Sequence, residues 1–384
     1  MINTKRLAET FKFLVEIDSV SKEETKISEA IIKAFKPFGA RFFFDNAGEK
    51  IGGDTGNLVV KLKGKTDVPP LLLSAHMDTV EPGRGIKAVL KDGLFTSDGT
   101  TILGADDKSA IAIIIETVNV LKENNLPHGP LELVFTVCEE SGLQGAKHLN
   151  YELITATYGY VLDSAETQGI VTRAPAANRF EFVVHGKEAH AGAFPERGIN
   201  AIWLVSKAIE GLNIGRIDDE TTCNIGMING GVATNIVPNR VTVQGEARSH
   251  NQEKLDRVTN NIVDAFKRVV ENEKQRSSDK LLPAIDIFVE NDFPLTHIPY
   301  DHPVVTCVMQ AAEKLGKKMA VRKTGGGSDA NIFFKNGIVT VVLGTGMCDV
   351  HTLHESIKVD DMVDSATLLL EIIKLHSQEN RVLS

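Results

Sequence analysis

The spacing of hydrophobic and polar residues changes several times along this 384-residue chain. Near the start, apolar residues recur with the helical period over residues 3–17 and 22–37. Continuous apolar runs then predict buried strands at 58–62, 71–75, 131–138 and 158–162, with a helix at 109–123. Strands that alternate with helices predict an α/β domain with a mostly parallel sheet flanked by helices.

The pattern changes near Asn178 and changes back after Pro294. Between them the order strand, helix, strand, strand, helix, strand is that of a ferredoxin-like α+β domain; the segments are 180–184, 200–210, 222–228, 241–246, 256–272 and 284–290. A helix at 304–315, a strand at 338–343 and a helix at 361–376 follow. We therefore predict one domain from 1–177 and 294–384, interrupted by an inserted domain at 178–293.

Composition narrows the classes of function. The chain is long enough for two hydrophobic cores, and its net charge of -9 argues against binding to nucleic acid or to an acidic membrane. The N-terminal segment lacks the features of a signal peptide, and no apolar run reaches the ~18 residues of a membrane span. Four widely spaced cysteines without a CxxC pair fit a reducing compartment, so we expect a cytoplasmic protein.

Acidic residues and histidines gather where predicted strands end. His76 and Asp78 follow the strand at 71–75, and Glu139 and Glu140 follow the strand at 131–138. Asp106 lies in LGADDK, directly before a helix. Taken alone, each cluster also fits a solvated loop or a helix cap. Carboxylates that are adjacent and partly buried, however, repel one another unless a cation or a proton compensates.

Two more clusters have the same placement. Asp163 ends the apolar strand at 158–162, and His351 comes just after the strand at 338–343. Open α/β sheets bind their ligands at the carboxyl ends of their strands. Histidines combined with carboxylates suit zinc, with cobalt or manganese as alternatives. The number of these side chains exceeds the needs of one tetrahedral ion, which favours two bridged ions.

Seven motifs carry a resemblance to a known family. They are HMDTV, GADDKSA, EESGLQGA, VLDS and HTLHES, with GKEAHAGAFPERGINA and GMINGGVATNIVPNRV in the inserted domain. In this order and spacing the chain resembles the M20 co-catalytic zinc peptidases over nearly its whole length. The doubled acid in GADDK resembles most the peptidase T (tripeptide aminopeptidase) branch.

The resemblance implies roles for the strand-end residues. Five ligands would hold two Zn²⁺ ions per subunit: His76, Asp106, Glu140, Asp163 and His351. Asp106 would bridge the ions, His76 and Asp163 would complete one site, and Glu140 and His351 the other. Glu139 would be the general base and Asp78 would orient His76. A cis peptide bond between Asp106 and Asp107 is also implied.

For the inserted domain, the resemblance implies a lid that also serves for dimerisation. His190 would help to polarise the scissile carbonyl, Asn235 would contact substrate, and Arg248 would hold a substrate carboxylate. Ser328, in GGGSDANIF, would lie on a substrate-side loop. The implied partners are a short peptide substrate and a second copy that pairs through the inserted domain.

The expected activity is metal-dependent hydrolysis of short peptides, with tripeptide aminopeptidase activity favoured. A carboxypeptidase, a dipeptidase and an N-acyl-amino-acid deacylase share the same metal ligands and differ in the lid pocket, which the sequence does not resolve. A non-catalytic peptide-binding homologue would be expected to lack a ligand or Glu139, and none is missing here.

Overall fold

A computed structural model describes residues 1–277 and 279–378 of the chain. These residues divide into two compact units. The larger unit comprises Met1–Arg173, His297–Lys323 and the chain from Ser328 onward, and the smaller unit comprises Ala174–Thr296 with Thr324–Gly327. The chain therefore leaves the larger unit at Ala174, returns at His297, and leaves it again only for the four residues Thr324–Gly327.

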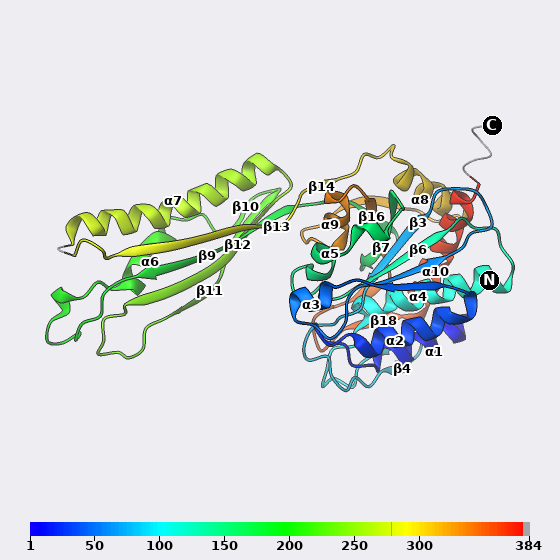
Figure 1. Cartoon of the computed structure of the whole chain (residues 1–384), viewed down its shortest axis with the longest axis horizontal. Helices are drawn as coiled ribbons and strands as arrows, with labels where there is room; N and C mark the ends of the chain where they lie inside the picture. Colours follow the sequence, from blue (N-terminus) through cyan, green and yellow to red (C-terminus); the bar gives the residue numbers. More distant parts are fainter. Residues whose placement is uncertain (278, 379–384) are drawn as a thin grey trace. The chain divides into compact units, whose positions relative to one another are not determined.

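The larger unit is organised around a nine-stranded sheet in the described residues (Figure 1). Its strands, in spatial order, are β1 (Arg41–Phe44), β2 (Leu58–Leu62), β6 (Leu131–Thr136), β3 (Leu71–His76), β7 (Tyr158–Ser164), β16 (Val339–Gly344), β8 (Gly169–Ala174) and β14 (Thr296–His297), with β15 (Ala320–Lys323) beside β8. The four central strands β6, β3, β7 and β16 are mutually parallel. Their carboxyl ends therefore meet at one edge of the sheet.

The central strands are covered on both faces. All six residues of β3 and all six of β6 are buried, which explains their continuous apolar sequences. Leu71, Leu73 and Ala75 belong to the main core cluster, whereas Leu72 is buried outside it, as expected for side chains that alternate between faces.

Helices supply the cover. Those around the main core are α1 (Thr4–Val15), α2 (Thr25–Phe35), α4 (Ala105–Glu123), α8 (Pro303–Lys314) and α10 (Val359–His376). Helix α4 packs on β3 and β7 and is flanked by α1 and α10. The shorter helices α3 (Ala47–Ile51), α5 (Gln144–His148) and α9 (Asp329–Lys335) pack on one another in series, with α9 on β16. None of the described helices combines the length and apolar character needed to cross a membrane.

A small second sheet completes the larger unit. Its order is β17 (Met347–Cys348), β18 (Ser356–Lys358), β5 (Leu94–Thr96) and β4 (Val89–Lys91). Pairing of β18 with β5 brings the segment that follows β16 next to the segment that precedes α4. Residues from the last quarter of the chain thereby reach the beginning of α4.

The described residues of the smaller unit form a five-stranded antiparallel sheet and two α-helices. The strands, in order, are β10 (Gly215–Asp218), β11 (Thr221–Gly230), β12 (Arg240–Ser249), β9 (Ala176–His185) and β13 (Ala284–Phe293); the helices are α6 (Ala201–Glu210) and α7 (Gln252–Arg276). Without the short β10, this is the ferredoxin-like arrangement that the sequence predicts. Phe180, Phe182 and Phe266 form the centre of its core.

The long predicted elements are present, with ends shifted by a few residues. Short elements such as β1, β4, β5, β17 and β18 were not expected. They have two to four residues each, too few for a periodic pattern to be recognised. The fold class is confirmed: a mostly parallel α/β sheet flanked by helices forms the larger unit.

One buried ion pair joins the N-terminal helix to the core helix. Arg6 donates from Nε to Oε2 of Glu116 at 2.6 Å and from Nη2 to Oε1 at 2.9 Å, and Glu116 is only 1% exposed. Arg6 also pairs with Glu123 on the surface of α4. Without Arg6, the buried Glu116 would lose its charged partner and keep the amide of Asn3, which donates to Oε1 at 2.8 Å.

We therefore expect Arg6→Met to lower the free energy of unfolding by about 3 kcal/mol. Lys5→Met is the control, because its ion pair with Glu9 is exposed and should contribute less than about 1 kcal/mol. Denaturant unfolding of both variants measures the difference. Equal losses in the two variants would contradict the role assigned to Arg6.

Candidate metal centre

Asp106 lies between two histidines that are 275 positions apart, His76 and His351 (351 − 76). Its Oδ1 is 3.0 Å from Nε2 of His76, and its Oδ2 is 3.1 Å from Nε2 of His351. Nε2 of His351 is also 2.8 Å from Oε1 of Glu140. Each oxygen of one carboxylate thus faces a different imidazole, which is the geometry required of a bridging ligand.

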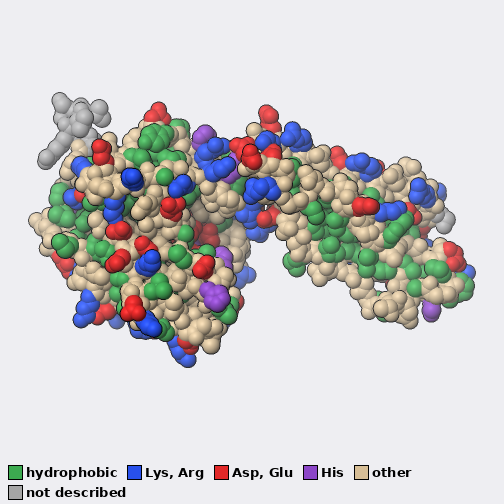
Figure 2. All heavy atoms as spheres, turned by 180° about the vertical axis from the view of Figure 1, so that it is seen from behind, with side chains coloured by type: hydrophobic (Ala, Val, Ile, Leu, Met, Phe, Trp, Pro, Cys, Tyr) green, Lys and Arg blue, Asp and Glu red, His purple; other side chains and the backbone are tan. Residues whose placement is uncertain are grey.

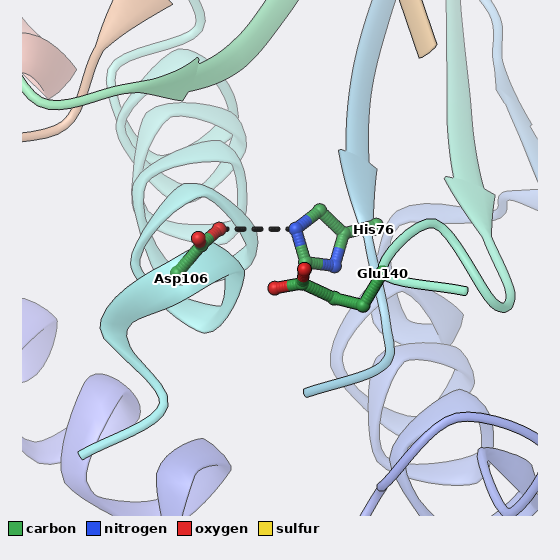
Figure 3. A group of neighbouring side chains, drawn as sticks. All are labelled: His76, Asp106 and Glu140. Carbon is green, nitrogen blue, oxygen red and sulfur yellow. Dashed lines mark hydrogen bonds and ion pairs between the residues drawn. The ribbon is translucent and has the colours of Figure 1, made fainter. Parts of the chain in front are cut away.

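Each of these side chains lies at the carboxyl end of the sheet. Figure 3 shows His76 extending from the end of β3, Asp106 from the first turn of α4, and Glu140 from the loop after β6. His351 is on the loop between β17 and β18, in the left-handed region with φ +63°. The bond between Asp106 and Asp107 is cis, so this implication of the resemblance is confirmed.

Ligand atoms gather into two overlapping groups. His76, Asp106 and Glu140 form one, and Asp106, Asp107 and Asp163 form the other, with all ligand atoms of a group within 4.8 Å of one another. Asp106 belongs to both. Asp107 was not expected among the candidate ligands. It is fully buried, its Oδ1 has no hydrogen-bond partner among the described residues, and its Oδ2 accepts the amide of His76 at 3.2 Å.

The electrostatics of this cluster favour a cation. Burial raises the pKa of Asp107, of Glu139 and of Asp163 well above the usual range of a carboxyl group, and neighbouring carboxylates raise it further. Burial would also raise the pKa of Asp106, but hydrogen bonds from His351 and His76 outweigh it and lower that pKa. Divalent cations would relieve this crowding of acids.

The surroundings of His76 fit a metal ligand. Its Nδ1 is 2.9 Å from the main-chain oxygen of Asp78 and donates to it, while its Nε2 faces Oδ1 of Asp106, where it could bind a metal ion once deprotonated. Metal-binding histidines have this arrangement, with the second nitrogen held by a carbonyl or carboxylate. Ligand atoms around one tetrahedral ion with bonds of about 2.0 Å lie about 3.3 Å apart, close to the separations found here. The donor set therefore fits divalent ions such as zinc.

Asp78 has more contacts than orientation of His76 requires. Its Oδ1 is 3.4 Å from Nδ1 of His76 and accepts the amide of Glu139 at 2.9 Å. Its Oδ2 accepts the amide of Glu140 at 3.2 Å and the hydroxyl of Ser21 at 2.7 Å. This fully buried carboxylate thus holds the loop that carries the two glutamates as well as the histidine.

Glu355 is a second buried carboxylate with a supporting position, and no role was predicted for it. Its side chain accepts the amides of Leu103, Gly104 and Asp106 at 2.7–3.0 Å. Only its place in HTLHES, four residues after His351, could have indicated it. Glu355 fixes the start of α4, where Asp106 lies.

The structure places three predicted substrate contacts in the smaller unit. His190 is exposed and pairs as an isolated bridge with Ile236, beside Asn235, whose carbonyl accepts the amide of Ala191 at 2.9 Å. Arg248 donates from Nη1 to the carbonyl of Gly325 at 3.1 Å and pairs with Glu246. The segments of His190 and Asn235 are thus adjacent, and Arg248 contacts the glycine loop.

Ser328, the fourth predicted contact, begins α9 in the larger unit. It forms a reciprocal capping box with Asn331, whose side-chain oxygen accepts the Ser328 amide at 3.1 Å. This capping accounts structurally for the serine. A role in substrate binding remains a prediction for all four residues.

The model of Peptidase family M20/M25/M40 matches residues 72–375. The chain belongs to the M20 peptidase family. The match covers most of the chain and includes every residue of the centre described above, so the family predicted from the motifs is confirmed.

Relatives of this M20 chain include proteins matched over nearly their whole length. The aminopeptidase PepT of Bacillus cereus is 41% identical with a TM-score of 0.87, over 98% of this chain and 99% of that one. A tripeptidase of Staphylococcus aureus is 38% identical with a TM-score of 0.91, over 98% and 100%. The uncharacterized protein YqjE of Bacillus subtilis is 40% identical over 97% and 99% of the two chains. The predicted resemblance to the peptidase T branch is thereby confirmed.

We expect divalent ions to stabilise the protein through His351. At a hundredfold excess over the dissociation constant, a bound ion adds about 2.7 kcal/mol to the stability of the folded state. His351→Ala should lose much of the rise in melting temperature that Zn²⁺ or Mn²⁺ gives to chelator-treated protein. His354→Ala, an exposed histidine on the same loop, is the control and should retain it. An unchanged response in His351→Ala would exclude this histidine as a ligand.

Proposed function

We propose that this M20 peptidase is a metal-dependent aminopeptidase that removes the N-terminal residue of tripeptides. The observation that carries the proposal is the placement of Asp106 between His76 and His351 in a chain similar over its full length to an aminopeptidase PepT and a tripeptidase. A more distant solved structure, 16% identical, is that of a Bacillus subtilis protein described as a dinuclear metal-binding peptidase of the M20 family. It shares the fold with this chain.

The proposed cofactor is a pair of Zn²⁺ ions in each subunit, with Co²⁺ or Mn²⁺ as alternatives. His76, Asp106 and Asp163 would hold one ion, and Asp106, Glu140 and His351 the other. Bound there, the ions would supply Lewis acidity for the scissile carbonyl and would lower the pKa of a water molecule. The remaining steps belong to side chains of this protein.

Glu139 is proposed as the general base. It precedes the proposed ligand Glu140, its amide is fixed by Asp78, and it is only 9% exposed. Burial raises the pKa of its carboxyl, which suits a group that must first accept a proton from water and then deliver it to the leaving amine. In the smaller unit, His190 would polarise the carbonyl, and Asn235, Arg248 and Ser328 would contact the peptide.

The activity test is a panel of substrates with the metal-loaded protein. A tripeptide, its N-acetylated form, its C-terminal amide, a dipeptide and an N-acyl amino acid separate the possible reactions. We expect a free N-terminal residue plus a dipeptide from the tripeptide, and no product after chelation. Release of the C-terminal residue, or turnover of the N-acyl amino acid alone, would instead assign a carboxypeptidase or a deacylase.

Glu139→Gln tests the base in the same assay. The amide has the size of the carboxylate but cannot accept the proton, so kcat should fall by about 10²- to 10⁴-fold while the metal content is unchanged. Full activity in Glu139→Gln, measured at equal metal content, would exclude Glu139 as the base.

We also propose that two copies pair through the smaller unit. Beyond its pairing with β10 at Thr221–Cys223, β11 runs along an edge of the sheet with Met227 and Ile228 more than half exposed. Figure 2 shows hydrophobic side chains gathered on the visible face of this unit. An exposed apolar edge strand can pair with the same edge of a second copy.

Sedimentation velocity tests the dimer. Wild-type protein should sediment as a dimer, and the double substitution Met227→Asp with Ile228→Asp should give a monomer. Phe288→Asp is the control, because Phe288 is equally exposed on β13, at the opposite edge of the same sheet. A monomeric wild-type protein would exclude the proposed pairing.

A further inference from the structure

The loop that carries Glu139 and Glu140 has no strand partner to hold its backbone. The ladder of β6 ends at Thr136, and residues 137–140 follow without regular pairing. Amide groups in such a buried loop need acceptors from elsewhere in the molecule. The groups that accept these amides fix the backbone of the loop. They therefore also fix the direction in which the side chains of Glu139 and Glu140 point.

Four consecutive amides of this loop donate to side chains rather than to the main chain. Val137 donates to Oδ1 of Asn57 at 3.0 Å, and Cys138 donates to Oε1 of Glu24 at 3.0 Å. The next two amides, described above, donate to the two oxygens of Asp78. We call these three acceptor side chains, Glu24, Asn57 and Asp78, the amide cradle. Two of its members, Glu24 and Asn57, lie outside the residues matched by the family model.

Cys138 is the residue in this loop whose conformation most needs support. Its φ is +50°, in the left-handed region that a residue with a β-carbon adopts only when its surroundings impose it. It directly precedes Glu139, so relaxation of Cys138 would turn the base and the neighbouring Glu140. The side chain that accepts its amide is Glu24, which also receives the thiol of Cys138 at 3.4 Å.

The setting of Glu24 argues against a role in its own helix. It occupies the cap position before α2, yet its side chain makes no capping hydrogen bond. It is fully buried, and Oε2 has no partner among the described residues. Besides Cys138, its Oε1 accepts only the amide of Lys22, at 2.9 Å. Burial, followed by repulsion from Asp78, raises the pKa of Glu24 to about 7. The first amide of α2, that of Thr25, donates instead to Oδ1 of Asp54 at 3.1 Å. The hydrogen bonds with Cys138 therefore offset part of the cost of burying the Glu24 carboxyl.

The other members of the cradle have additional duties. Asn57 also binds the carbonyl of Gly145 and the carboxylate of Asp45, and Asp78 also contacts His76 and Ser21. Substitution of either residue would disturb several parts of the fold. Glu24 offers the cleanest test, because among the described residues the side-chain hydrogen bonds of Glu24 outside its own turn go to Cys138 alone.

We propose that Glu24 is a positioning residue for the proposed peptidase: through the Cys138 amide it fixes the backbone that aims Glu139 and Glu140. This rests on the proposed function for its effect on turnover, but not for its effect on the loop. The contact requires an acceptor oxygen at the right distance and does not require a charge.

Three substitutions separate these requirements. Glu24→Gln keeps the length of the side chain and an acceptor oxygen and removes the charge. Glu24→Asp keeps the charge and withdraws the oxygen by one methylene, and Glu24→Ala removes both. The matched control is Glu132→Gln: Glu132 is also a buried carboxylate, but it lies at the start of β6 and binds Lys61 and Thr155.

Each variant is measured as the full chain with metal ions at saturation. Amide hydrogen exchange of the 137–140 segment reports on the loop, and kcat and KM for the preferred peptide report on the base. We expect Glu24→Gln to stay within about threefold of wild type. Glu24→Asp and Glu24→Ala should lose protection in this segment and lose about 10- to 100-fold in kcat with little change in KM, because a misplacement near 1 Å can cost about 100-fold.

The outcomes are distinct. Wild-type protein that hydrolyses no peptide overturns the proposed function, while hydrogen exchange still tests the position of the loop. Unchanged exchange of residues 137–140 in Glu24→Asp and Glu24→Ala overturns the positioning role. The positioning role is also overturned if Glu24→Asp keeps the wild-type kcat while Glu24→Gln loses it, because the negative charge would then be what matters. A merely structural role predicts that all variants, including Glu132→Gln, lose stability and keep kcat per folded molecule. If Glu24→Ala does not fold, Glu24→Asp decides.

Discussion

Crowding of acidic groups at the carboxyl ends of four parallel strands is the constraint on which the rest of this structure depends. Glu139 and Glu140 follow β6 and Asp163 lies at the end of β7, whereas Asp106 meets them from the first turn of α4. Left without cations, such a group would repel itself and would favour protonation of several members. His76 and His351 face Asp106 and Glu140 and relieve part of this repulsion. The acidic groups that remain crowded together make the cluster a candidate for binding metal ions.

The same type of hydrogen bond holds each segment that carries these acidic side chains. Buried side-chain carboxylates accept the main-chain amides of the segments that bear the proposed ligands: Asp78 and Glu24 for the loop after β6, and Glu355 for the start of α4. A carboxylate bonded to amides is a strong, charge-assisted acceptor. Because the ligands depend on main-chain geometry, a residue such as Cys138 can influence the centre without contributing a side chain to it.

Much of this could be read from the sequence because its causes are local. Apolar runs ending in His76, Glu139 and Asp163 gave both the strands and the edge at which their neighbours meet. Glu24 and Asn57 could not be found in this way, and neither could the contact of Glu355 with the start of α4, although the HTLHES motif places Glu355 near His351. They act on amides 114, 80 and about 250 residues away, and nothing in a linear pattern indicates such a contact. The small sheet of β4, β5, β17 and β18 was not predicted for a different reason: strands of two or three residues are too short to show a hydrophobic periodicity.

The larger unit is built from stretches of chain that lie before and after the smaller unit, and His351 belongs to the part that follows it. The entropic cost of closing a flexible segment between two fixed points rises slowly with its length, by about 0.6 kcal/mol for each doubling. The inserted unit can therefore vary in length and sequence at little cost to the stability of the larger unit, provided that its two ends remain next to β8 and β14. If the smaller unit contacts the peptide, as proposed, a change confined to that unit would alter substrate preference and leave the metal centre unchanged.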